Sequence, residues 1–169
     1  MTPQNNSDHQ KNNTIISLWS DLHHQKQKLW LPVLSGSMLP LLRIGDRVLV
    51  ESVSPENIKF GDIIVFKDLD KMVVHRVIQI YKDGSKSFLQ KGDNARIAEI
   101  VIGENIIGRV TAVQRGTKVI SLNFWIWKTY NYILTFISWS SYSHKPENLV
   151  LRKIAKLFYK IIKMLLKRM

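Results

Sequence analysis

The sequence predicts a mainly β fold for the central part of the chain, arranged as an antiparallel β-sandwich or a partly open barrel. Three observations lead to this prediction. Short runs rich in Val, Ile and Phe recur between residues 47 and 114, at a spacing typical of small antiparallel folds. Clusters of Gly, Pro, Asn and Asp separate the runs and are typical of turns. No crossover helix of the length that a parallel sheet needs intervenes between the runs.

The predicted strands lie in one domain, residues 31–116, and span residues 47–53, 62–67, 72–81, 87–90 and 106–114. In the third of them, the alternation of side chains places Val73, His75 and Val77 on one face. Of the 169 residues in the chain, 45% are hydrophobic. That is enough for one core, with further segments at both ends of the domain.

Residues 1–30 form a polar lead. Residues 1–13 are rich in Asn, Gln, Ser and His, a composition typical of disorder. Residues 14–30 carry apolar side chains at helical spacing and predict a short helix, which is too polar to span a bilayer. The lead shows no signal-peptide pattern.

Residues 117–169 contain a Trp-rich segment followed by a basic one. Residues 119–143 include three of the five tryptophans and a single charged residue, Lys128. Tryptophan and tyrosine prefer the interface of a bilayer, but a helix docked on the sheet explains the same composition. The sequence leaves both interpretations open.

The last segment predicts a C-terminal amphipathic α-helix over residues 148–169. Its apolar residues and its lysines form two stripes at helical spacing. The chain has a net charge of +12, and residues 145–169 carry eight basic residues and one acid, a net of +7. We therefore expect these residues to bind an anionic membrane surface, so that the protein is membrane-associated, peripherally or marginally inserted. A helix packed on the domain with solvated lysines is the alternative. Nucleic acid is not an expected partner, because no binding module accompanies the basic stripe.

A candidate nucleophile lies in the loop Ser35-Gly36-Ser37-Met38-Leu39-Pro40, although the hexapeptide taken alone favours an ordinary Ser/Gly turn. A serine hydroxyl needs a base, and His75 is the histidine that falls within a predicted strand. An imidazole on an apolar face stays neutral, as a general base must, but such a histidine is often only structural. The chain has no cysteine, which excludes disulfides and a thiol nucleophile. No metal or other cofactor is expected.

Four blocks occur in a specific order: SGSMLPLL at residues 35–42, GDIIVF at 61–66, VVHRVI at 73–78 and KGDN at 91–94. Their order and spacing resemble the signal peptidase I family. The closest likeness is to its Ser-His branch, found in the endoplasmic reticulum, in archaea and in some Gram-positive bacteria. The resemblance covers roughly residues 31–116.

The resemblance implies roles for five residues. Ser37 matches the nucleophile and His75 the general base. The hydroxyl of Ser35 and the backbone N–H of Ser37 match the donors of the oxyanion hole. Asp93 matches an aspartate that orients His75 or stabilises its protonated form. Met38 matches a residue that helps to wall the pocket for small side chains.

The sequence departs from the family pattern in two places. The Ser-His enzymes usually continue after KGDN to a further aspartate, and here Glu99 falls at about that spacing as possible acidic support. Family members also usually have an N-terminal membrane anchor directly before the serine block. In this chain the stretch at that place, residues 20–34, is short and polar. Lys91 is a rival base, as in the Ser-Lys branch, but the block order places the base at His75.

The function that the resemblance implies is a serine endopeptidase of the signal peptidase I type. It would cleave polypeptides after small residues, removing a leader or signal peptide. One alternative is a cytosolic peptidase that matures a ribosomally made peptide or a self-cleaving regulator. Another is a non-catalytic, membrane-associated pseudopeptidase or binding module. The sequence does not identify the substrate or the side of the membrane.

Overall fold

The computed structural model describes residues 28–81, 86–123 and 125–143. Within these ranges the chain forms eight strands and the helix α2, Trp125–Ser143. The strands are β1 Lys28–Pro32, β2 Arg47–Glu51, β3 Ile63–Asp68, β4 Lys71–Ile80, β5 Ser87–Lys91, β6 Ala98–Ile102, β7 Ile106–Arg115 and β8 Lys118–Ser121. The predicted mainly β fold is confirmed. The amphipathic helix expected over residues 148–169 lies outside the described residues.

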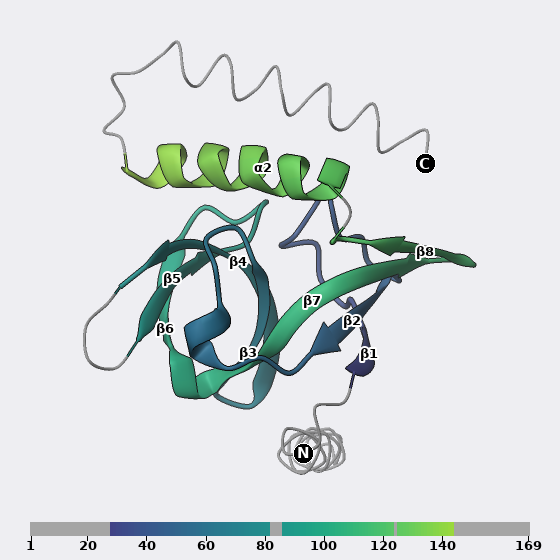
Figure 1. Ribbon diagram of the computed structural model, residues 1–169, viewed down its shortest axis with the longest axis horizontal. Helices are drawn as coiled ribbons and strands as arrows, with labels where there is room; N and C mark the ends of the chain where they lie inside the picture. The colour runs from purple at the N-terminus through teal and green to yellow at the C-terminus, as the bar shows by residue number, and fades with distance from the viewer. Residues whose placement is uncertain (1–27, 82–85, 124, 144–169) are drawn as a thin grey trace, which may run out of the picture.

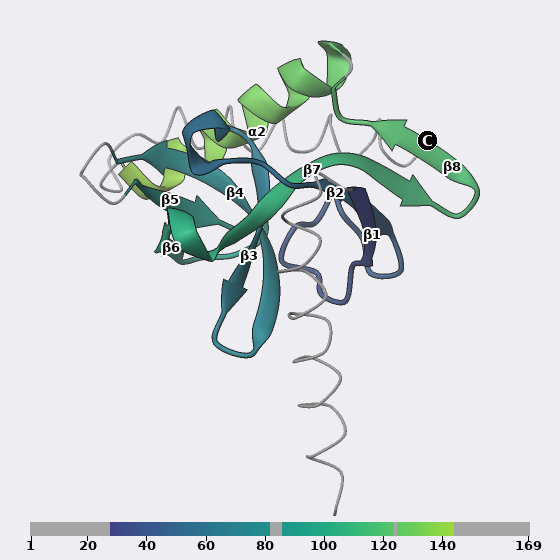
Figure 2. The same cartoon turned by 60° about the horizontal axis from the view of Figure 1, so that its bottom comes forward.

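The strands form one antiparallel sheet in the order β1-β2-β7-β3-β4-β5-β6, and β8 pairs with β7. The strand β7 is central because it pairs with β2, β3 and β8 at different points along its length. Figure 2 shows β7 running between two parts of the sheet, with β3–β6 on one side and β1 and β2 on the other. Bulges in the β2–β7 and β3–β7 pairings accompany the bending of the sheet.

Two apolar clusters fill the two parts of the curved sheet, and β3 contributes to both. Ile63 and Val65 pack in the cluster enclosed by β1, β2 and β7. Ile64 and Phe66 pack in the cluster enclosed by β4, β5 and β6. Because side chains alternate along a strand, a strand buried on both faces reads as a continuous apolar run, as GDIIVF does.

All five predicted strands are confirmed, with ends within about two residues. The strands β1, β6 and β8 were not predicted. Residues 28–30 fall at the end of the segment expected to be helical, but they lie in β1, where Trp30 is opposite Leu49 of β2. Pairing with a distant strand overrides local helical periodicity here. The rest of that segment lies outside the described residues.

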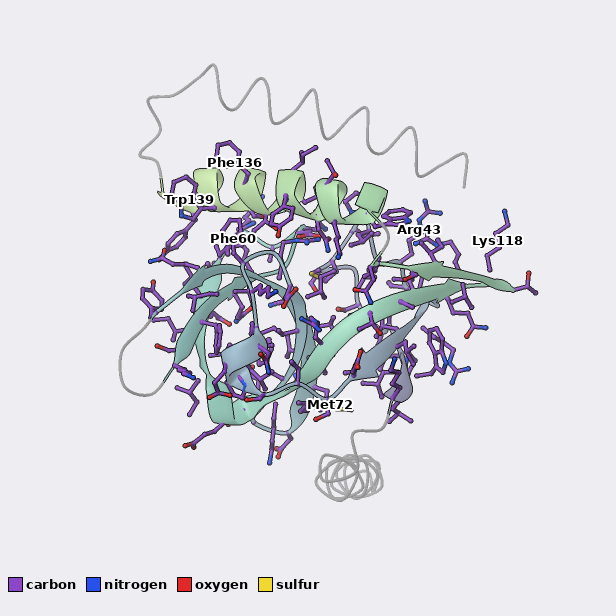
Figure 3. The ribbon with its side chains drawn as sticks, viewed as in Figure 1. Arg43, Phe60, Met72, Lys118, Phe136 and Trp139 are labelled. Atoms are coloured by element: carbon purple, nitrogen blue, oxygen red, sulfur yellow. The ribbon has the colours of Figure 1, made fainter. Side chains whose placement is uncertain are left out.

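The helix α2 lies across one side of the sheet, over β4 (Figure 1). Its inner side buries Leu134, Thr135 and Ser138. Tyr132 and Phe136 are more than half exposed, and Figure 3 shows Phe136 on the side of α2 that faces away from the sheet. The Trp-rich segment is therefore a docked helix with aromatic side chains left on its outer face. No helix in the described ranges is long and apolar enough to cross a bilayer.

Candidate active site

The serine loop, residues 33–46, connects β1 to β2 and is closed at its base by the backbone. The N–H of Val33 donates to the carbonyl of Asp46 at 2.8 Å, and the N–H of Gly45 donates to the carbonyl of Val33 at 3.1 Å. Met38 and Leu42 within the loop are buried in the core, at 2% and 0% exposure. The loop is thus anchored on both sides of Ser37, and it is not a free surface turn.

A buried carboxylate fixes the second half of the loop. Asp46 accepts hydrogen bonds from the guanidinium of Arg115 at 2.7 and 3.0 Å and from the backbone N–H of Arg43 at 2.9 Å. Arg115 also donates to the carbonyl of Leu41 at 2.9 Å. Bidentate bonding of a guanidinium to a carboxylate is rigid, so the end of β7 orients the segment after Ser37.

The loop after β5 contacts the serine loop directly at Ser37. The backbone N–H of Asn94 donates to the carbonyl of Ser37 at 2.7 Å, and its side-chain amide donates to the carbonyl of Gly36 at 3.3 Å. A Cβ placed on Gly92 would lie 2.7 Å from the Ser37 carbonyl oxygen and 3.0 Å from Nε2 of His75. Only glycine permits this approach. The serine loop and the imidazole therefore meet at Gly92.

His75 lies half-buried on β4, beside the ring of Phe66 at 6.1 Å between centroids. Its Nδ1 is 2.5 Å from Oε1 of Gln90. An amide oxygen can only accept a hydrogen bond, so this contact calls for the proton on Nδ1 and, in the neutral ring, leaves the lone pair on Nε2. That lone pair lies on the side of the ring that faces Gly92 and the serine loop. This is the tautomer that a general base for Ser37 requires.

Burial lowers the pKa of His75 below its ordinary value, because the charged imidazolium loses solvation. The hydrogen bond to Gln90 and the charges of Asp93 and Glu99 oppose this lowering, and the charge of Lys91 adds to it. Burial also lowers the pKa of Lys91. The ammonium group of Lys91 donates to the carbonyl of Gly92 at 3.4 Å. Because neighbours on a strand alternate, Lys91 points away from the face that Gln90 shares with His75.

Arg76, the neighbour of His75, is fully buried and binds three parts of the chain. Its guanidinium donates to both carboxylate oxygens of Asp93 at 2.7 and 2.8 Å. It also donates to the carbonyl of Gly61 at 3.1 Å and to the side-chain oxygen of Asn131 on α2 at 2.6 Å. One side chain thus joins β4, the KGDN loop, the turn before β3 and the docked helix.

The structure brings some of the predicted site residues together and separates others. The hydroxyls of Ser35 and Ser37 lie 3.4 Å apart. Asp93 binds Arg76 through a side chain that is 3% exposed, while the partner of the His75 ring is Gln90. Met38 packs in the core.

Glu99 is exposed on β6, directly opposite Gln90 in the strand pairing. Asp62, another aspartate that follows a glycine, accepts from the backbone N–H of Lys59 at 2.9 Å and serves a turn. Across the described ranges, no three His, Asp or Glu side chains come together as a metal site.

Sequence reasoning missed Gln90, Gly92, Asn94 and Arg76 as parts of the site. Gln90, Gly92 and Asn94 lie in or next to the KGDN block. The sequence shows the place of this block among the four, but not the contacts that its residues make. The position of Gln90 next to His75 depends on the β4–β5 register, in which Val77 is opposite Gln90 and a bulge follows. A single sequence carries no signal for that bulge.

Comparison with known proteins matches the sequence profile described as Peptidase S24-like to residues 2–111. The chain is also similar to the signal peptidase complex catalytic subunit SEC11C of Homo sapiens, Mus musculus and Canis lupus familiaris. Each is 41% identical over 69 residues, which cover 38% of this chain and 36% of the relative. The matched stretch therefore spans about a third of the length of these curated relatives.

Replacing Gly92 with alanine tests whether the serine loop and His75 meet at this residue. We expect Gly92→Ala to displace the Ser37 carbonyl or the His75 ring and to destabilise the fold by about 1–3 kcal/mol. Urea unfolding and the ring resonances of His75 report the two effects. Gly36→Ala is the control, because its new Cβ would meet only the flexible side chain of Leu39. Unchanged stability and unchanged His75 resonances in Gly92→Ala would contradict the contact.

Breaking the Arg76–Asp93 ion pair tests how much the pair contributes to the stability of the fold. We expect Arg76→Met to cost about 3–5 kcal/mol, because it leaves a buried carboxylate without a partner. The double variant Arg76→Met with Asp93→Leu should recover much of that loss, since neither charge remains. Lys86→Met removes the exposed pair with Glu56 and should change stability far less. The free energies of unfolding decide between these outcomes, and a double variant no better than Arg76→Met would count against the pair.

Proposed function

Because the chain belongs to the Peptidase S24-like family, we propose that it is a serine endopeptidase of the signal peptidase I type. It uses Ser37 and His75 to cleave leader or signal peptides after small residues. The observation that carries the proposal is the meeting of the Ser37 backbone and Nε2 of His75 at Gly92. The resemblance of the four sequence blocks to signal peptidase I agrees with the similarity to SEC11C.

In the proposed reaction the hydroxyl oxygen of Ser37 attacks the scissile carbonyl carbon, and its proton passes to Nε2 of His75. The carbonyl oxygen becomes an oxyanion that accepts from the hydroxyl of Ser35 and the backbone N–H of Ser37. His75 then gives the proton to the leaving amine as the peptide bond breaks. Water, deprotonated by His75, hydrolyses the acyl-enzyme and regenerates Ser37.

The electrostatics around His75 suit a base of this kind. Burial lowers the pKa of His75, so the imidazole stays neutral down to a lower pH. Asp93 and Glu99 contribute negative charge that favours the imidazolium formed during the reaction. We assign both to electrostatic support, with Asp93 acting from its pair with Arg76 and Glu99 from the edge strand β6. Met38 would shape the small-residue pocket from beneath, since it packs in the core directly after Ser37.

The substrate class we propose is a polypeptide with a leader or signal peptide. The relatives are named as the catalytic subunit of a signal peptidase complex. A peptide substrate at a membrane surface requires the enzyme to reach that surface. We propose that residues 145–169, with their net charge of +7, bind anionic lipid. The exposed Tyr132, Phe136 and Tyr142 on α2 precede this segment and offer aromatic rings suited to the headgroup region.

Replacing either proposed catalytic residue tests the mechanism. We expect Ser37→Ala and His75→Ala each to reduce cleavage by roughly 10⁴-fold or more, because the nucleophile and its base act as a unit. Ser35→Ala should cost about 10²–10³-fold as an oxyanion donor. Cleavage of a panel of secretory precursors, followed by mass spectrometry, measures the rates and locates the cut.

Ser54→Ala is the matched control, since Ser54 is an exposed serine before a short 3₁₀ turn without a side-chain cap bond. Full activity in Ser37→Ala or His75→Ala with a folded protein would refute the assignment. Absence of any cleavage by the wild-type chain across the panel would favour a pseudopeptidase. Cleavage of a cytosolic leader peptide instead of secretory precursors would favour the peptide-maturing alternative.

Deleting residues 145–169 tests the proposed membrane contact. The deletion should release the protein from vesicles that contain anionic phospholipid, because each basic residue near such a surface contributes about 1 kcal/mol. Co-sedimentation with anionic and with neutral vesicles measures the effect. A full-length variant with the five lysines of the stripe changed to glutamine keeps the length and should bind anionic vesicles weakly; those lysines are Lys153, Lys156, Lys160, Lys163 and Lys167. Equal sedimentation of the deletion and the wild type would refute the role of this segment.

A further inference from the structure

We propose that Gln90 is the positioning residue of His75: its amide oxygen holds the proton on Nδ1 and directs the lone pair of Nε2 toward the serine loop. The inference deepens the proposed function and rests on it. It gives a neutral amide the place that a carboxylate occupies in a Ser-His-acid triad.

The geometry of Gln90 supports this role. Its side chain is 2% exposed, and its Oε1 lies 2.5 Å from Nδ1 of His75. Val77 is opposite Gln90 in the β4–β5 pairing, so His75 is its diagonal neighbour on the same face of the sheet. Both residues lie on strands and not on loops, which fixes their relative orientation.

The amide differs from a carboxylate in what it does during the reaction. An acid in this place orients the ring and also stabilises the imidazolium that forms. An amide oxygen orients the ring at every pH but carries no net charge. The charge on the imidazolium must therefore be balanced from further away.

The charged groups around His75 compensate the positive charge of the imidazolium only weakly. Asp93 is already paired with Arg76, the residue next to His75 on β4. Glu99 on β6 is exposed to solvent, which weakens its effect. Lys91 on β5 acts in the opposite direction, since its positive charge lowers the pKa of His75. The site therefore contains a well-oriented base whose protonated form is only weakly stabilised.

Two variants separate orientation from charge. Gln90→Glu keeps an acceptor near Nδ1 and adds a negative charge, and Gln90→Leu removes the acceptor at similar volume. Gln79→Leu is the control, a half-buried glutamine on β4 with no assigned part in the site. The measurements are the pH dependence of kcat/KM on a cleaved precursor, kcat and KM separately, and ¹⁵N NMR of the histidine rings. The resonances of His75 are those that disappear in His75→Ala.

The wild-type acid limb should lie below about pH 6.5, the ordinary pKa of histidine, because activity requires neutral His75 and burial lowers its pKa. Gln90→Glu should move this limb upward by about one pH unit or more, since a nearby carboxylate favours the imidazolium. Gln90→Leu should lower kcat by about 10–100-fold with little change in KM, because the ring loses its orientation. Gln79→Leu should leave the profile unchanged.

The NMR measurement keeps this inference distinct from the proposed function. At a pH where His75 is neutral, the wild type should show a protonated Nδ1 and an unprotonated Nε2, whether or not any precursor is cleaved. A proton on Nε2 in the wild type would overturn the role of Gln90 even in an active peptidase. An active Gln90→Leu variant with unchanged kcat and acid limb would overturn it as well. If the wild type shows the expected tautomer but cleaves no precursor, the proposed function is refuted and the role of Gln90 in orienting the ring is not.

Discussion

The buried guanidinium of Arg76 is the constraint on which the rest of the site depends. It lies on β4 next to His75 and binds the carboxylate of Asp93, the carbonyl of Gly61 and the side chain of Asn131. A fully buried charge is tolerated only when its partners are complete, so these groups must occupy fixed places. The KGDN loop, the turn before β3 and the helix α2 are therefore tied to the strand that carries the imidazole.

The serine loop depends on that arrangement because its own contacts come from elsewhere in the fold. The carbonyl groups of Gly36 and Ser37 accept from Asn94 in the KGDN loop, and Asp46 at the loop's end binds Arg115 of β7. A hydroxyl in an exposed turn would lose its orientation through backbone motion. Here the turn is fixed from both sides, which is the preorganisation that the proposed attack by Ser37 needs.

The surroundings of His75 combine a fixed orientation with weak charge compensation. Gln90 determines which nitrogen carries the proton, while Asp93 is engaged by Arg76 and Glu99 is solvated on the edge strand. Orientation and charge stabilisation, which one acid supplies in a Ser-His-Asp triad, are thus divided among several groups. The family blocks led us to propose Ser37 and His75, whereas the contacts of Gln90 and of Arg76 with Asp93 are seen only in the fold.

The sequence by itself determined the β class and five of the strands, because alternating apolar runs and turn residues are local patterns. The four ordered blocks, also local, are what led us to propose Ser37 and His75 as the reactive pair. For the Trp-rich segment, the sequence left two interpretations open, a helix docked on the sheet and a segment at the bilayer interface. Only the tertiary structure decided that residues 28–30 join the sheet, that Asp93 binds Arg76 and that Gln90 reaches His75. Those contacts follow from strand register and a bulge after Val77, which arise when distant segments pair. Local patterns identify chemical groups, and register determines which of them touch.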